Sequence, residues 1–174
     1  MSVVTLNNVH KVYPMGKEKV EAVKGVSFSI EKGEFAAISG PSGSGKSTLL
    51  NMIGLIDLPS SGSIEIGGIN VYQGVDLGRV EIDNSRWAST PEKGKKRRTT
   101  IPKRLDIKIT ALRRSQLGFI FQTFNLIPVL NVYENIEFPL LLKSKNPASL
   151  SPVDKFSAKE KKEWVDFLIE KVGL

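Results

Sequence analysis

Eight consecutive residues have the types and spacing of a phosphate-binding loop. They are, in order, Gly40, Pro41, Ser42, Gly43, Ser44, Gly45, Lys46 and Ser47. The run fits the pattern G-x-x-x-x-G-K-[ST] at every fixed position, and Thr48 follows it directly. Because glycine adopts torsions closed to other residues and has no side chain, successive backbone N–H groups can point inward at one phosphate. The start of the next helix adds partial positive charge, Lys46 can reach the β and γ phosphates, and the Ser47 hydroxyl can bind Mg²⁺.

The flanking sequence predicts the strand and the helix that such a loop requires. The apolar run Glu34–Ser39 before the loop is short enough for a strand buried on both faces. From Ser47 onward the apolar residues fall on one stripe of a helix, which Leu58–Gly62 would end. An ordinary Gly/Ser turn is the alternative, and this context argues against it.

Four further segments, three before the loop and one after it, predict strands. Val3–Leu6, Val9–Tyr13 and Val23–Ile30 are rich in β-branched and aromatic residues, so a hairpin-like opening is expected around the turn residues Pro14–Lys17. Ser63–Ile66 alternates polar and apolar residues before two glycines, as a half-exposed strand does.

The second half of the chain is less regular. Glycines and prolines interrupt residues 73–111, which we interpret as a basic irregular insertion. Leu117–Phe121 predicts a short buried strand that ends at Gln122. Asn131 and Ser157 are each followed three residues later by glutamate, the arrangement of a capping box that opens a helix.

Composition excludes several classes of protein. With 174 residues the chain fits one domain, and with no cysteine and one histidine any metal must be held by oxygen ligands. Zinc hydrolases and disulfide scaffolds are therefore excluded. No apolar stretch approaches the roughly 18 residues of a membrane span, and no secretory signal is visible, so we expect a cytoplasmic protein.

The net charge of +7 comes from one segment. Between Lys93 and Arg114 ten basic residues and one acidic residue, Asp106, give +9, which leaves −2 for the rest of the chain. This segment raises the alternative of an anionic nucleic-acid or lipid-headgroup binder. It contains no aromatic residue to stack on bases, so a solvated basic loop is the favoured interpretation and nucleic acid is not the expected partner.

Several motifs together resemble the nucleotide-binding domain of an ABC transporter. No Asn-Lys-x-Asp sequence occurs, which argues against GTPases. The resemblance is carried by Ile38–Leu50, Ser61–Ile64 and Leu117–Gln122. Within the family the chain is most similar to the lipoprotein-releasing and macrolide-efflux type of ATP-binding subunit, through Asn51–Gly54, Phe124–Pro128 and Glu134–Ile136.

The resemblance implies an α/β fold with a P-loop NTPase core, an antiparallel β subdomain at the N-terminus and a partial helical subdomain at the C-terminus. We accordingly divide this single partial ATP-binding domain, residues 1–174, into four parts. They are the β subdomain with the P-loop core (1–72), the basic insertion (73–111), the strand to the Q-loop (112–122) and the start of the helical subdomain (123–174).

The resemblance also gives roles to single residues outside the phosphate loop. Tyr13 stands where the family places an aromatic residue that stacks on adenine, and any π-face serves for stacking. Gln122 stands at the family's Q-loop glutamine, whose amide oxygen binds Mg²⁺ together with Ser47 and helps to orient the attacking water. The structural alternatives are a strand-end core aromatic for Tyr13 and a polar strand-end residue for Gln122.

The cofactors and partners implied by the resemblance are those of a transporter engine. ATP and Mg²⁺ bind at the loop, and their binding energises export or release of a substrate by membrane partners. Those partners are a transmembrane permease subunit, which Phe124–Tyr133 would begin to approach, and a second ATP-binding subunit in a head-to-tail dimer. The implied location is cytoplasmic and peripheral, on the inner face of the cell membrane.

The chain departs from the family in its hydrolytic half. It has no Leu-Ser-Gly-Gly-Gln signature, no apolar strand ending in Asp-Glu and no switch histidine downstream. Gly67-Gly68 lacks the flanking residues, Asp83 and Asp166 follow no apolar run, and His10 precedes the loop. We therefore expect the amino-terminal portion of a longer ATPase, with a complementary carboxy-terminal half as a further partner, and an isolated chain that does not hydrolyse ATP.

A small P-loop kinase is the remaining alternative. Such an enzyme would use the same loop and would close a lid of arginines over two substrates, for which Arg97, Arg98 and Arg104 are the candidates. The positions of Tyr13 and Gln122 fit the transporter family better.

Overall fold

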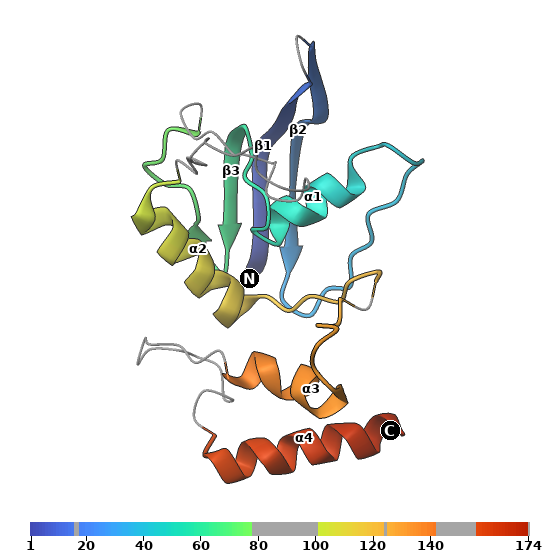
Figure 1. Ribbon diagram of the computed structural model, residues 1–174. Coiled ribbons are helices and arrows are strands. Elements are labelled where there is room, and N and C mark those ends of the chain that lie inside the picture. The colour runs from blue at the N-terminus through green and yellow to red at the C-terminus, as the bar shows by residue number, and fades with distance from the viewer. Residues whose placement is uncertain (16–17, 78–100, 124, 142–155, 174) are drawn as a thin grey trace, which may run out of the picture. The chain divides into compact units, whose positions relative to one another are not determined.

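The structure is a computed structural model that describes residues 1–15, 18–77, 101–123, 125–141 and 156–173. The chain forms two compact units, Met1–Leu117 and Gly118–Leu174, and each is described by itself. The first unit holds the strands, the phosphate loop and two helices, and the second holds the last two helices (Figure 1).

A four-stranded antiparallel sheet forms the base of the first unit. Its strands are β1 (Ser2–Met15), β2 (Glu18–Glu31), β3 (Ser61–Ile66) and β4 (Ile69–Asn70), in the order β2-β1-β3-β4. The predicted hairpin is confirmed, and the two predicted segments at its start belong to one strand, β1. The β1–β2 register shifts on both sides of Lys11, which marks a bulge there.

Helices α1 (Lys46–Ile53) and α2 (Lys103–Gln116) pack with the sheet into one core. The helix predicted after the phosphate loop is confirmed, although it ends at Ile53, before the predicted stop at Leu58–Gly62. Leu105, Ile109 and Leu112 are spaced by four and three residues, so they share one face of α2 and are buried in this core. In α1, Leu49 and Met52 are buried in the same core.

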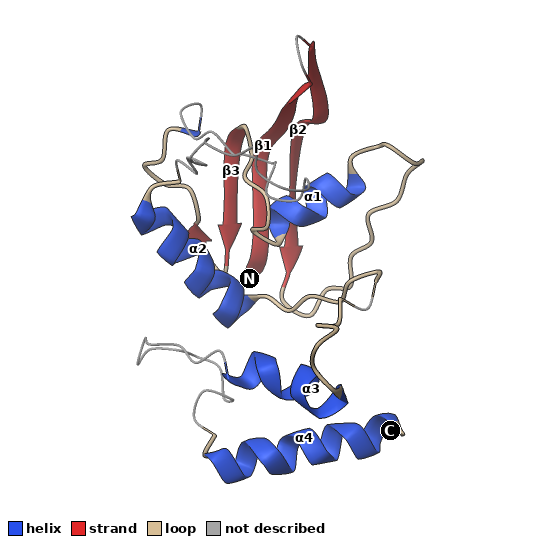
Figure 2. Ribbon diagram, in the orientation of Figure 1, coloured by secondary structure: helices blue, strands red, loops and turns tan. Residues whose placement is uncertain are grey.

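The second unit pairs α3 (Val132–Leu141) with α4 (Ala158–Val172) (Figure 2). Both predicted capping boxes are confirmed. Asn131 and Glu134 exchange side chain to backbone hydrogen bonds of 2.8 and 2.9 Å, and Ser157 and Glu160 do so at 2.7 and 3.3 Å. Among the described helices none is both long and apolar enough to span a bilayer.

Two predicted strands are absent, and these predictions were wrong. Glu34–Ser39 and Leu117–Phe121 lie in no sheet, and Phe35 is 96% exposed. An apolar run becomes a buried strand only where neighbouring strands satisfy its backbone N–H and C=O groups. Within the described residues neither segment pairs with a strand of the sheet, and Phe35 stays exposed whereas Ile38 and Leu117 are half-buried against the core.

The predicted irregularity of residues 73–111 was also wrong for its last part. Residues from Lys103 onward are helical, because the apolar residues of α2 recur at helical spacing and bury against the sheet. Pro102 precedes the helix and does not interrupt it, as expected for proline at a helix start. Asp83, Arg97 and Arg98, like most of the basic segment before α2, lie outside the described residues.

Gly62 in β3 is fixed by a close approach to β1. It has φ +92°, and a Cβ atom there would lie 2.7 Å from the carbonyl oxygen of Asn7 and closer still to that of Asn8. Gly68 has a similar φ of +77° but has open space around its Cβ position.

We expect Gly62→Ala to lower the free energy of unfolding more than Gly68→Ala does. Both changes place alanine in a left-handed conformation, at a cost of roughly 1–2 kcal/mol. Only the first adds a backbone collision, so its midpoint in urea unfolding should fall further. Equal midpoints for the two variants would contradict this account of the β1–β3 approach.

Candidate phosphate and nucleotide site

The glycines of the loop have conformations that other residues rarely adopt. Gly43 has φ +81° and Gly45 has φ +85°. A Cβ atom on Gly45 would collide with the backbone carbonyl oxygen of Ala22 in β2, and one on Gly40 would lie 2.8 Å from Ser44 Oγ. Glycine at position 45 therefore lets the loop pass directly against the sheet before α1 begins.

The Lys46 side chain, near the end of the loop, forms hydrogen bonds with the backbone at its start. Its Nζ donates hydrogen bonds to the carbonyl oxygens of Gly40, at 2.9 Å, and Pro41, at 2.7 Å. The N–H of Ser44 donates to the carbonyl of Pro41 at 3.3 Å, which folds the exposed residues Pro41 and Ser42 into a turn. The ammonium group of Lys46, the first residue of α1, is thus held over the loop.

The start of α1 offers donors to an anion. Gly45 is the N-cap and provides no side-chain cap, and the first turn of the helix carries no acidic residue. The first N–H groups of a helix have no partner inside it and carry its partial positive charge. Together with the Lys46 ammonium and the exposed Ser47 hydroxyl, they form a donor set that fits a phosphate chain and its Mg²⁺.

Tyr13 lies at the same end of the unit, held by its hydroxyl group. The hydroxyl donates to Asp57 Oδ2 at 2.6 Å. Burial raises the pKa of Tyr13 to about 12, and the Asp57 carboxylate contributes to the rise. The half-buried phenol therefore stays protonated at neutral pH and remains a donor.

Two residues of this site were missed by sequence reasoning. Lys11 and Asp57 form a buried ion pair with an Nζ to Oδ1 distance of 2.7 Å. A signal for the pair exists in the sequence, because Lys11 follows Val9 on the buried face of β1 and a buried lysine requires an acidic partner. Asp57 is the only acidic residue between Glu34 and Glu65.

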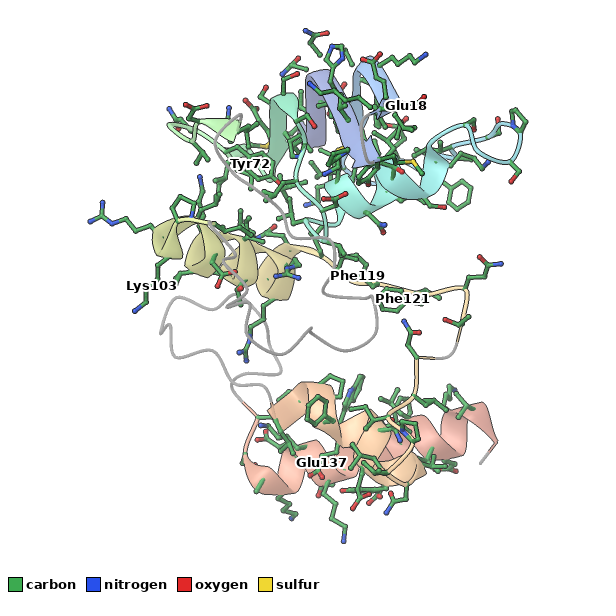
Figure 3. All side chains as sticks on the ribbon, turned by 45° about the horizontal axis from the view of Figure 1, so that its top comes forward. Glu18, Tyr72, Lys103, Phe119, Phe121 and Glu137 are labelled. Carbon is green, nitrogen blue, oxygen red and sulfur yellow. The ribbon has the colours of Figure 1, made fainter. Side chains whose placement is uncertain are left out.

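Gln122 belongs to the second unit, whereas Tyr13 and the phosphate loop belong to the first. It is exposed and lies in a bend directly after Phe119 and Phe121, whose rings stack with centroids 5.7 Å apart (Figure 3). The structure brings the loop, Thr48 and Tyr13 together, and Gln122 is described only within its own unit.

The segment predicted to begin the helical subdomain is organised by Asn135. Its side chain accepts from the N–H of Ile127, at 2.8 Å, and donates to the carbonyl of Leu130, at 2.9 Å. Phe124, the first residue of that segment, lies outside the described residues.

Three candidates that the sequence analysis set aside lie in other parts of the fold. His10 contacts Glu21 at 3.1 Å, Gly67-Gly68 forms the β3–β4 turn, and Asp166 lies in α4. In the described part of the chain no three histidine, cysteine or acidic side chains gather as a metal site.

Comparisons with known proteins identify the family of the chain. Residues 23–174 match the protein family described as ABC transporter. The chain is 34% identical over 172 residues to the lipoprotein-releasing system ATP-binding protein LolD of Hahella chejuensis, covering 99% of this chain and 57% of the relative. It is 37% identical to the macrolide export ATP-binding/permease protein MacB of Bdellovibrio bacteriovorus over 138 residues, covering 79% of this chain and 17% of the relative.

Solved structures agree with this assignment. The ATP-binding cassette MJ0796 of Methanocaldococcus jannaschii, solved as a dimer bound to ADP and Pi, superposes with a TM-score of 0.67 at 34% identity. The match covers 98% of this chain and 57% of that one. The chain spans about half the length of the curated relatives it matches. The expected cassette fold is confirmed, partial relative to the full domain, and the chain belongs to the ABC transporter family as an ATP-binding domain with LolD-type and MacB-type homologues.

Proposed function

We propose that this chain binds Mg-ATP through its Walker A loop, residues 40–47, as part of the ATP-binding subunit of an ABC transporter. The observation that carries the proposal is the loop itself, where Gly45 packs against β2 and Lys46 is held over the loop. The free N–H groups at the start of α1 supply further donors to phosphate oxygens.

Each remaining site residue has a proposed role at this loop. Lys46 neutralises charge on the β and γ phosphates, and Ser47 and Gln122 are oxygen ligands for Mg²⁺. Thr48 continues the donor set of the first turn, and the ring of Tyr13 stacks on the adenine base. The Thr48 side chain, in the first turn of α1, lowers the pKa of the Tyr13 hydroxyl, and this influence supports a role for the ring close to the phosphate loop.

The biological role that fits the family is the energising of export or release of a substrate. The proposed partners are a transmembrane permease subunit, a second ATP-binding subunit in a head-to-tail dimer and a complementary carboxy-terminal half. The proposed location is the cytoplasmic face of the cell membrane. The LolD and MacB names support export or release, and the dimeric MJ0796 structure supports pairing of two subunits.

We further propose that the isolated chain binds nucleotide without hydrolysing it. Phosphoryl transfer depends on positioning and on stabilisation of developing charge. The sequence has a phosphate loop but no apolar strand ending in Asp-Glu, the element that supplies the water-polarising carboxylate in the family that the chain resembles.

The small-kinase alternative is not retained, because the family match includes the segments on both sides of the loop. The lid arginines that this alternative required give it no support either. Arg104 lies at the exposed start of α2, and the other two lie outside the described residues.

Lys46→Ala should weaken Mg-ATP binding by about 10- to 100-fold, because a hydrogen bond from a charged donor to phosphate is lost. Isothermal titration calorimetry on the whole chain measures the effect. Lys159→Ala is the matched control, since this exposed lysine of α4 has only a surface pair with Glu163 and its loss should leave binding unchanged. Equal affinities for wild type and Lys46→Ala would overturn the proposed site.

Phosphate release by the isolated chain should stay at the level of buffer alone under saturating Mg-ATP. A coupled phosphate assay on wild type and Lys46→Ala checks this, and the two rates should be indistinguishable. Steady turnover by the wild type that Lys46→Ala abolishes would show that the chain completes a catalytic site.

A further inference from the structure

Two charged residues, Lys11 and Asp57, contact one face and the hydroxyl group of Tyr13. The side chain of Lys11 is 4% exposed and that of Asp57 is 12% exposed, so both charges lie inside the first unit. Lys11 Nζ donates to Asp57 Oδ1 and to the carbonyl oxygen of Leu58, both at 2.7 Å. It also lies over the ring of Tyr13, 4.8 Å from the centroid.

Asp57 joins the two partners. Its Oδ2 accepts the Tyr13 hydroxyl at 2.6 Å, while Oδ1 accepts both Lys11 and the N–H of Leu58, the latter at 2.8 Å. Its own N–H donates to the carbonyl of Asn51 in α1 at 3.1 Å. The carboxylate is therefore fixed to the end of the helix that begins at the phosphate loop.

These contacts remove the freedom of the Tyr13 ring. The hydroxyl is anchored at one end, and the ammonium of Lys11 covers one face. A base can then stack only on the opposite face. A binding group held in its bound orientation beforehand loses less entropy when the ligand arrives.

We propose that Lys11 and Asp57 are positioning residues for the nucleotide base, which hold the ring of Tyr13 beside the phosphate loop with the face opposite Lys11 available for stacking. This inference rests on the proposed function, because it requires that the loop binds a nucleotide. Neither residue touches the ligand, and both act through the orientation of one ring.

The test compares a ligand that has a base with one that has none. Mg-ATP and magnesium tripolyphosphate are titrated into the whole chain by calorimetry. Stacking on an aromatic ring strengthens binding by a factor of about 5 to 150 per base, and a poorly oriented ring gives a smaller gain. Tyr13→Phe keeps the ring and removes its anchor, so ATP affinity should fall about 5- to 10-fold while tripolyphosphate affinity changes by less than about twofold.

A second variant examines the charged pair itself. Lys11→Met combined with Asp57→Asn removes both charges together, so neither is left buried without a partner. The same ATP-specific loss is expected, in a protein whose thermal unfolding by circular dichroism remains cooperative. Tyr72→Phe is the matched control, because the Tyr72 hydroxyl is buried near Asp57 but has no hydrogen-bond partner among the described residues.

The outcomes separate the inference from the function on which it rests. An ATP-specific loss in both variants, with the control unchanged, supports the positioning role. Equal losses for the two ligands indicate a purely structural pair and overturn it, as does no loss at all. If the wild type binds ATP no more tightly than tripolyphosphate, the base site is refuted while the phosphate site stands, and if it binds neither ligand, the proposed function itself fails.

Discussion

The close approach of Gly45 to the Ala22 carbonyl is the constraint on which the rest of the first unit depends. A side chain at this position would push the loop away from β2, because the Ala22 carbonyl is a backbone group and cannot rotate aside. With glycine there, α1 begins directly against the sheet, and Leu49 and Met52 reach the core shared with β1, β3 and α2. The same contact fixes where the free N–H groups of α1 lie. Packing and phosphate recognition therefore share one steric requirement.

The pair of Lys11 and Asp57 makes a second link between the sheet and the segment after α1. A buried ion pair adds little net stability, because the cost of removing two charges from water offsets their attraction. The main contribution of the pair is to fix the geometry of the groups that it joins. The Lys11 and Asp57 contacts join β1, the end of α1 and Tyr13, and Ser60 reinforces them by donating its N–H to the carbonyl of His10 at 2.8 Å. In this network a slipped register would leave a buried charge unpaired, which is costly.

Local chemistry explains what the sequence predicts well. The phosphate loop, the β1–β2 hairpin, the helix after the loop and both capping boxes depend on residues within a few positions of one another, so their patterns are readable in one dimension. The helix at Lys103–Gln116 was missed because prolines, glycines and a dense charge obscured a three-residue apolar face, whose burial depends on a distant sheet. The Lys11–Asp57 pair was missed for a related reason, since its members are 46 positions apart and meet only through the fold.

The two absent strands show what an apolar run does and does not specify. Two segments, Glu34–Ser39 and Leu117–Phe121, have the composition of strands buried on both faces. Such a strand forms only where other strands pair with it on both sides. In the described residues the sheet ends at β2 and β4, and neither segment joins it. Exposed side chains such as Phe35 and Ile120 are then unusual for a folded domain, since large apolar groups are normally buried or covered by a partner. The apolar pattern thus indicates that the segment requires neighbouring strands, but it does not show whether such strands are present. The hairpin and the helix caps differ, because their hydrogen-bond partners lie within the same few residues.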